Sequence, residues 1–486
     1  MHAPAEERRS HLAHSRLARG LALALAALTA GTWLWSHMCQ FPAMVWNDIR
    51  LAPAVALSQG WPIYPIPGQG TINTWTYGPL PLLFLWPATW AASAPVALQV
   101  AAVLNLSLIL VPLALVCFGS PDSTTPAASR LGRLTAFLLC VLAWPAEFYA
   151  LYYADSLALA CGLLGNLLLL RSRPPAFPSL WLAAVLAAAA VASKQTALGI
   201  PLAQVLWLGL TGGRRAAARH VLRCAAAGLV LGAASVALFG WSGLWFVLVE
   251  LPAGFRWFPE PLKRLWFVAP ELALYLGVPA ALMLWQRRAF STRPALQLVA
   301  LSWACAIPLG LLALLKLGGR TNTLYSFPLW LPFVATAALA SLHRDRRWRW
   351  LPLAAACAAA ALGCLRLLAA PRLPLRPQTA AYRDADSLAR QLSGRIWFPF
   401  HPLVTLYTDR RYYHDEDGLF VWQTTRGQIP PGQAAAHLPP AMQFIALRNG
   451  WSDWGVARRM LPPNARFTAV GDWTLWHAGA DQNPSR

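Results

Sequence analysis

The chain has 486 residues, of which 57% are hydrophobic and only 12% are charged. Water-soluble domains carry about 25% charged residues, so this composition excludes a disordered chain and argues against a soluble protein. A formal net charge of +21 would fit a nucleic-acid partner if the basic residues formed one patch. They lie instead in short clusters between apolar runs, so we expect a polytopic membrane protein and no nucleic-acid partner.

Apolar runs follow one another along most of the chain. A spanning helix needs about 20 apolar residues, or fewer where it is broken or shielded by protein. Arg16 and Arg19 precede the first run, and no small-x-small cleavage site follows it, so we interpret it as a retained anchor. The runs predict about eleven spans, at residues 18–38, 95–118, 134–151, 156–170, 179–194, 196–210, 221–240, 266–286, 295–315, 324–342 and 350–370.

Two stretches are too long to be simple connections. Residues 39–94 form a large first outer loop, in which the Pro-rich segment 79–92 suits a helix lying in the membrane interface. The polarity of residues 371–486 is mixed, with helical spacing at 380–393 and short strands expected at 395–398, 443–448 and 473–477. We predict an all-α membrane domain over residues 1–370 and a small extracytoplasmic α/β domain over residues 371–486.

The basic residues orient this arrangement. With the N-terminus inside, arginines concentrate in the inner connections, as the positive-inside rule requires. An odd number of spans then puts the C-terminal domain outside. Richness in Ala, Arg and Leu is typical of a GC-rich genome, and we expect the inner membrane of a bacterium, with a periplasmic C-terminal domain. The outer connections before residue 366 hold few cations: Arg50, Lys194, Arg256, Lys263, Arg264, Lys316 and Arg320.

Acidic residues of the membrane domain gather on the outer side. An ionisable group at a helix centre costs about 2.5–3.5 kcal/mol, so this placement indicates an outer cavity. Asp48 is a candidate general base, which must be a carboxylate near the substrate's proton; a helix cap or a pair with Arg50 is the alternative. Asp155, where the third span emerges, can equally cap the next helix.

Three further segments carry polar groups at the same side. Tyr77-Gly78-Pro79-Leu80 opens the interfacial helix, with proline in a favoured first-turn position. Lys194-Gln195 interrupts an apolar hairpin, where an ammonium needs an anion, water or carbonyl groups. Lys316 and Arg320 share the outer turn that ends at Asn322. The three cations can clamp a phosphate, or alternatively snorkel to lipid headgroups.

In this order the motifs resemble the GT-C superfamily of integral-membrane glycosyltransferases, and in particular the lipid-linked-oligosaccharide glucosyltransferases and their bacterial relatives. The resemblance covers roughly residues 18–342. Asn47 and Ile49 flank Asp48, which departs from the acidic pair of protein mannosyltransferases, and the WWDYG-like motif of oligosaccharyltransferases is missing. The matching segments are Asp48, Tyr77-Gly78-Pro79-Leu80, Tyr153-Ala154-Asp155, Lys194-Gln195-Thr196 and Lys316 to Asn322.

The resemblance implies inverting transfer of one sugar from a polyprenyl-phosphate donor to a glycan, lipid or protein acceptor on the outer face. Asp48 would remove the acceptor proton, while Lys194, Lys316 and Arg320 would offset charge on the leaving phosphate. Tyr77, Asp155, Gln195 and Asn322 would contact the substrates.

Some members of the superfamily use a divalent metal, which Asp48 with Asp155 could hold, although the sequence requires no cofactor. A transporter or a lipid or glycan flippase is the alternative function, but transporters place polar groups at mid-membrane, whereas here they gather at the outer ends. In the tail, His401 and the run Tyr412–Asp417 could touch an acceptor; charged runs usually face water, and we expect a surface position.

Overall fold

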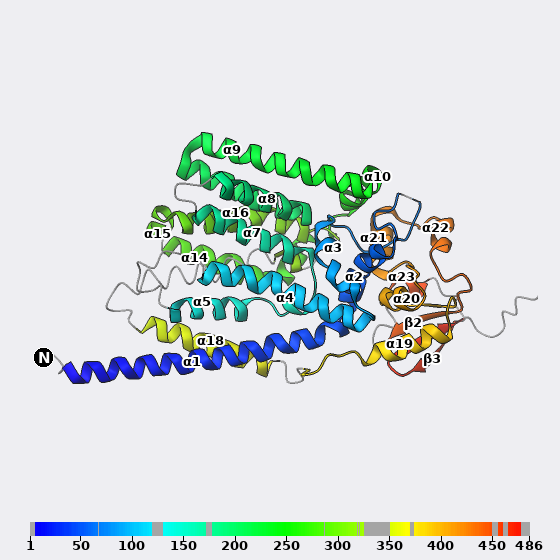
Figure 1. Ribbon diagram of the computed structural model, residues 1–486, viewed down its shortest axis with the longest axis horizontal. Coiled ribbons are helices and arrows are strands. Elements are labelled where there is room, and N and C mark those ends of the chain that lie inside the picture. The colour runs from blue at the N-terminus through cyan, green and yellow to red at the C-terminus, as the bar shows by residue number, and fades with distance from the viewer. Residues whose placement is uncertain are drawn as a thin grey trace, which may run out of the picture.

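The structure, a computed structural model, describes residues 5–66, 68–118, 130–171, 177–285, 287–317, 319, 321–324, 350–369, 374–449, 455–459 and 465–477. Long helices lie roughly side by side in a bundle, and a small sheet with its own helices lies at one end of that bundle (Figure 1). Helix α1 (Ala5–Gln40) begins at the opposite end.

Five helical segments among the described residues are long and apolar enough to cross a membrane, and a bent pair over residues 261–285 makes up to six. The chain is therefore a multi-pass membrane protein. The expected span 324–342 lies almost wholly outside the described residues, so the total of eleven stays a prediction. The five segments are Leu17–Ala43, Ala94–Phe118 (α4), Ala154–Arg171 (α7), Gln195–Phe239, which contains α9 (Gly199–Phe239), and Pro294–Leu314 (α16).

Shorter elements complete the bundle. Proline sets several of their limits, because it lacks an N–H and breaks a helix interior. Pro145 follows the end of α5, where one span over 134–151 was expected, and Pro87 lies at the start of η2 within the expected helix 79–92. The elements are η1 (Phe41–Ala43), α2 (Val45–Ser58), α3 (Leu80–Phe84), η2 (Trp86–Trp90), α5 (Arg130–Ala143), α6 (Glu147–Ala150), α8 (Phe177–Ser193), η4 (Gln195–Leu198), α10 (Trp241–Trp245), η5 (Phe246–Glu250), α11 (Leu251–Gly254), α12 (Pro261–Phe267), α13 (Ala269–Leu272), η6 (Ala273–Gly277), α14 (Val278–Trp285), α15 (Arg287–Thr292), η7 (Thr321–Leu324) and α18 (Leu351–Leu368).

Helices α1 and α18 pack along each other at one side of the bundle (Figure 1). A Cβ atom at Gly363 would lie 2.0 Å from the Thr29 hydroxyl oxygen, so glycine permits this approach. Small residues serve the same purpose at other membrane helix contacts. From α18, Arg366 donates hydrogen bonds to the carbonyl oxygens of Leu142 and Trp144, at 3.2 and 3.0 Å. The guanidinium thus satisfies carbonyl groups at the C-terminal end of α5.

The C-terminal part holds a four-stranded sheet in the order β1-β2-β4-β3. Strands β1 and β2 are parallel, while β4 pairs antiparallel with β2 and β3. The helix expected at 380–393 is α19, and three of the strands match expected ones; the missed strand is β3, an exposed edge. The elements are α19 (Ala380–Gln391), β1 (Ile396–Trp397), α20 (Pro402–Thr408), α21 (Glu416–Arg426), α22 (Pro431–Ala436), β2 (Phe444–Arg448), α23 (Val456–Arg459), β3 (Arg466–Val470) and β4 (Trp473–His477).

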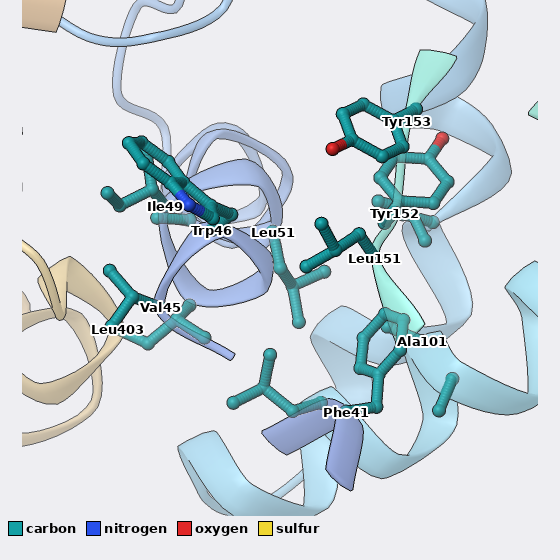
Figure 2. Packing of buried hydrophobic residues seen from close by; sticks show 14 of the residues in the cluster. Phe41, Val45, Trp46, Ile49, Leu51, Ala101, Leu151, Tyr152, Tyr153 and Leu403 are labelled. Atoms are coloured by element: carbon teal, nitrogen blue, oxygen red, sulfur yellow. The ribbon is translucent and has the colours of Figure 1, made fainter. Parts of the chain in front are cut away.

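Helix α2 joins the two parts. It is buried along most of its length and packs against α20 on one side and against α4 and the 151–153 segment on another. Figure 2 shows Val45 of α2 beside Leu403, while Leu51 faces Leu151 and Ala101. One continuous hydrophobic core therefore runs from the membrane helices into the C-terminal part.

Candidate active site at the outer end of the bundle

Lys194 and Asp155 form a buried ion pair. The Lys194 Nζ atom lies 2.5 Å from Asp155 Oδ2, and their side chains are 7% and 10% exposed. The Asn322 side-chain amide donates to the same oxygen at 3.3 Å. The ring of Tyr77 has its centroid 5.7 Å from Nζ. Four residues predicted for the site, from four separate segments, therefore meet at one point.

Local backbone geometry puts these groups together. Lys194 is extended (φ −150°, ψ 124°) between the end of α8 and η4, so the chain turns there and its side chain reaches the first turn of α7, which holds Asp155. A Cβ atom at Gly78 would lie 1.6 Å from the carbonyl oxygen of Ala192. Glycine therefore lets the loop that carries Tyr77 rest directly on the end of α8.

Two hollows adjoin this ion pair. Asp155 and Lys194 line a small cavity of about 30 Å³, together with Ser302 and Thr323. A much larger apolar groove of about 790 Å³ begins beside them, where Pro79, Ala192 and Leu198 form part of its wall. The groove continues between the two halves of α9 and is bordered by α8, α10 and η5. A charged pair thus sits next to the mouth of a hydrophobic channel.

Two other predicted residues that the structure describes do not join the pair. The Gln195 side chain is exposed and donates to the Leu248 carbonyl oxygen at 3.4 Å, on the groove wall. Lys316 donates to the Pro252 carbonyl oxygen at 3.1 Å and stacks near Trp257. Arg320 lies outside the described residues.

Asp48 lies in a different cluster, at the start of α2. Its side chain is completely buried. The Tyr382 hydroxyl donates to Oδ2 at 2.6 Å and the Leu403 backbone N–H donates to Oδ1 at 3.0 Å, while His401 Nδ1 lies 3.4 Å from Oδ2. Burial raises the pKa of Tyr382 well above its ordinary value, and the nearby carboxylate adds to this, so the phenol keeps the proton that it donates. Asp48 lines neither hollow described above.

The neighbours of Asp48 on α2, Asn47 and Arg50, contact the 150–153 segment of the membrane domain instead of the C-terminal part. Asn47 donates to the Ala150 carbonyl oxygen at 2.8 Å and accepts from the Tyr152 N–H at 2.8 Å. Arg50 donates to the Tyr152 carbonyl oxygen at 3.0 Å, and its guanidinium carbon lies 4.1 Å from the Tyr153 ring centroid. Because Asp155 follows two residues later, α2 connects the C-terminal part to the segment that carries the ion pair. Sequence reasoning missed Tyr382, which no motif marks.

The expectation that the tail motifs face water is wrong for most of their polar groups. His401, His414, Asp415 and Glu416 are each at most 2% exposed. The last three hold the first outer loop and α23 in place: His414 Nδ1 accepts from the Ile72 N–H at 2.8 Å, Asp415 Oδ2 accepts from the Thr74 N–H at 3.0 Å, and Glu416 Oε2 accepts from the Ala457 N–H of α23 at 2.8 Å. Burial lowers the pKa of His414 to about 4 and raises that of Glu416 to about 7.

A metal ion shared by Asp48 and Asp155 does not fit this arrangement. Each carboxylate belongs to its own hydrogen-bonded cluster, and Asp155 is already neutralised by an ammonium group. Within the part of the chain that the structure describes, no group of three or more His, Cys, Asp or Glu side chains is placed to hold a metal ion. We therefore assign no step to a metal.

Comparisons with known proteins define the fold. No family model and no curated protein sequence matches the chain. Among solved structures, it is similar to ArnT from Cupriavidus metallidurans in a crystal structure bound to undecaprenyl phosphate, with a TM-score of 0.57 and 13% identity. The match covers 95% of this chain and 98% of that chain. The chain therefore has an ArnT-like GT-C fold, as its motifs indicated: a polytopic helical bundle with a small C-terminal sheet.

Proposed function

We propose that the protein transfers a sugar from a polyprenyl-phosphate carrier to an acceptor at the end of the bundle where the C-terminal part lies. The observation that carries this proposal is the Lys194–Asp155 pair at the mouth of an apolar groove of about 790 Å³. A lipid phosphate fits this arrangement, because its anionic head can bind the Lys194 ammonium group and its long apolar tail can lie in the groove. The fold shared with a structure bound to undecaprenyl phosphate supports the same substrate class.

The groove suits the tail of the carrier. Its wall is almost entirely aliphatic and aromatic, and includes Pro79 as well as Trp241 and Trp245 of α10. Burying apolar surface contributes about 25 cal/mol per Å². In a membrane, a groove open to lipid lets the tail enter from the bilayer without crossing water.

The phosphate end meets Lys194. An ammonium group has three hydrogen-bond donors, of which Asp155 takes one, so Lys194 can also contact a phosphate. During transfer, the acceptor oxygen bonds to the anomeric carbon as that carbon's bond to the phosphate oxygen breaks. The bonding electrons leave with the phosphate, whose oxygen can take the proton that the acceptor hydroxyl loses, and a fixed cation stabilises the growing charge. Lys316 and Arg320 stay proposed second cations for the same phosphate.

Asp48 was assigned above as the base that takes the acceptor's proton, with inversion at the anomeric carbon. That role requires the carboxylate to reach an acceptor, but Asp48 is completely buried, lines neither hollow and already accepts hydrogen bonds from Tyr382 and the Leu403 backbone. In the arrangement described, Asp48 is better suited to positioning: it fixes the C-terminal part against α2. We propose this positioning role and keep the base as the alternative to be tested.

The test uses full-length protein in proteoliposomes with a radiolabelled polyprenyl-phosphate sugar as donor and membrane glycolipid extract as acceptor. Changing Lys194→Met together with Asp155→Asn removes both charges, which avoids leaving one buried charge unpaired. We expect sugar transfer to fall at least about 100-fold, as it does when an electrostatic group is removed from other active sites.

The matched control is Lys263→Met. Lys263 on α12 is 76% exposed and forms an ion pair with Glu260, the residue before that helix, so transfer should be unchanged. Transfer by the double variant at the control's rate would contradict the proposed site. Movement of intact donor across the bilayer without any transfer would instead indicate the flippase alternative.

A further inference from the structure

Four polar side chains form a continuous hydrogen-bonded chain among the spanning helices. His220 Nε2 lies 3.0 Å from Gln204 Oε1, Gln204 donates to Asn166 Oδ1 at 3.0 Å, and Asn166 donates to the Ser302 hydroxyl oxygen at 2.9 Å. All four residues are at most 5% exposed. Both amides are used in one consistent direction, so His220 carries its proton on Nε2 and donates it to Gln204. A polar group buried among membrane helices costs free energy when it lacks a hydrogen-bond partner. These hydrogen bonds therefore hold the four side chains, and the helices that carry them, together.

The His220–Gln204 bond crosses a break in α9. Gly213 has non-helical angles (φ 79°, ψ 174°), and α9 turns back there, so that its two halves lie beside each other. In Figure 1 the second half runs along one edge of the bundle to α10. Gln204 belongs to the first half and His220 to the second. Their hydrogen bond is therefore a bridge between the halves, close to the turn.

The bridge lies where the apolar groove ends. On the first half of α9 the groove is lined by Pro201, Leu202 and Val205, and on the second half its lining begins again at Val221. The bridging residues Gln204 and His220 are the immediate neighbours of Val205 and Val221. From Val221 to Trp241, at the mouth, the helix rises about 30 Å, at 1.5 Å per residue. The groove is thus nearly as long as a bilayer's hydrocarbon core is thick.

The other end of the chain reaches the candidate active site. Ser302 lines the small cavity together with Asp155 and Lys194. A single buried hydrogen-bond chain therefore runs from that cavity to the α9 residues beside Val205 and Val221 of the groove, and it links α7, α16 and both halves of α9.

We propose that the Gln204–His220 bridge closes the inner end of the groove and so sets the length of polyprenyl chain that the protein holds. His220 is a positioning residue: it does not contact the polyprenyl tail but keeps the two halves of α9 together at the end of the groove. This inference rests on the proposed function, because it assumes that the groove binds the carrier's tail.

The experiment compares a long and a short lipid phosphate. Full-length protein in nanodiscs is titrated with undecaprenyl phosphate and with geranyl phosphate, and binding is followed by isothermal titration calorimetry. The variant Gln204→Leu with His220→Leu removes the bridge while keeping the interior apolar. We expect about tenfold weaker binding of undecaprenyl phosphate, with less than about a twofold change for geranyl phosphate, whose chain fills only the outer part of the groove.

Two further variants separate positioning from general loss of structure. His220→Gln keeps a donor toward Gln204 and should bind both lipids as the unchanged protein does. Thr211→Val removes a hydroxyl that donates within the first half of α9, to the Trp207 carbonyl oxygen at 2.8 Å, and should have no effect. Spin labels at the exposed positions Leu206 and Leu222 should report a wider separation of the halves only when the bridge is removed.

An equal loss of affinity for both lipids in the bridge variant, or no loss for either, would overturn the inference while leaving the proposed function intact. An unchanged spin-label distance would overturn it as well. If the unmodified protein bound neither lipid, the proposed function would fail along with it.

Discussion

Asp48 is held by donors that all come from the C-terminal part of the chain. Tyr382 provides the shortest of these contacts, at 2.6 Å, and a hydrogen bond to a charged group is worth about 1.5–3 kcal/mol. Both partners are buried, so removal of either leaves the other one hydrogen bond short in a place that water does not reach. The interaction is therefore strong enough to fix how the C-terminal part sits on α2.

Paired variants distinguish positioning by Asp48 from base catalysis. Tyr382→Phe removes the donor but keeps the ring, and Asp48→Asn removes the charge. If Asp48 acts by positioning, both changes should lower the rate of sugar transfer by a similar factor, about tenfold, because the active geometry loosens. Steady-state kinetics on both variants, with the pH profile of kcat, measure this.

A different pattern would restore the base assignment. A loss of about 100-fold or more in Asp48→Asn, with Tyr382→Phe close to normal, is the pattern expected of a missing general base. The acidic limb of the pH profile would then disappear in Asp48→Asn alone.

Four of the predicted site residues, Tyr77, Asp155, Lys194 and Asn322, lie together because each is a polar group at the outer end of an apolar segment. Such groups must find partners in a shielded place, which the sequence can indicate. The direction in which a residue of α2 faces is different. Asn47, Asp48 and Arg50 are near neighbours in sequence, yet they contact different parts of the molecule, and only the packed structure decides which.

At the scale of elements, the loop that carries Tyr77 lies against α8 with no room for a side chain at Gly78. We predict that Gly78→Ala destabilises the protein by about 1–3 kcal/mol, as overpacking does in other cores, and lowers transfer because Tyr77 moves away from Lys194. Thermal unfolding of purified protein and the transfer assay check this. Gly31→Ala is the control, since a Cβ atom there would meet nothing within 4 Å. Equal behaviour of the two variants would show that the close approach does not matter.

The apolar runs predict where helices occur, but they do not predict the residues at which these helices begin and end. The expected spans 196–210 and 221–240 lie almost entirely within α9, because helical hydrogen bonding continues on both sides of Gly213 and no proline lies in the turn. The expected helix 79–92 is instead two short helices, α3 and η2. Strand β3 escaped prediction because all but one of its residues are exposed, which leaves no buried face for a hydrophobic pattern to report.

At the scale of the whole molecule, the first outer loop is fastened to the C-terminal part by groups that titrate. His414 accepts the Ile72 N–H at Nδ1 and donates from Nε2 to the Gln433 carbonyl oxygen at 3.0 Å, so it must be neutral. Its pKa is lowered from 6.5 to about 4, chiefly by burial. His437, whose ring lies 5.6 Å away, lowers it further.

This contact should weaken in acid. The pKa of His414 is lower in the folded state, so the unfolded or undocked state binds more protons between pH 6.5 and 4. The stabilisation that neutral His414 gives to this contact is therefore complete above pH 6.5 and falls toward pH 4, by up to about 3 kcal/mol. Hydrogen exchange of residues 71–74 should therefore quicken over that range. His414→Gln can make both hydrogen bonds without titrating, so it should remove this contribution. Glu416, whose pKa is raised to about 7, changes stability in the opposite sense and is the same in both proteins.

Identical acid dependence of exchange in His414→Gln and the unchanged protein would mean that His414 is not responsible for it.

The boundary between the two parts, near residue 370, lies next to segments outside the described residues, so the division into two domains stays a prediction. The structure shows contacts between the membrane helices and the C-terminal part, including the ion pair of Arg426 with Glu250 at 2.5 Å.

The most direct test of sugar transfer from a lipid carrier is mass spectrometry of lipid-linked sugars and envelope glycans in cells with the protein, without it, and with the Lys194→Met and Asp155→Asn double variant. We predict that one polyprenyl-phosphate sugar accumulates, and one defined sugar disappears from a glycan, lipid or protein, both in cells without the protein and in cells with the double variant. Identical lipid-linked sugars and glycans in all three would contradict the account.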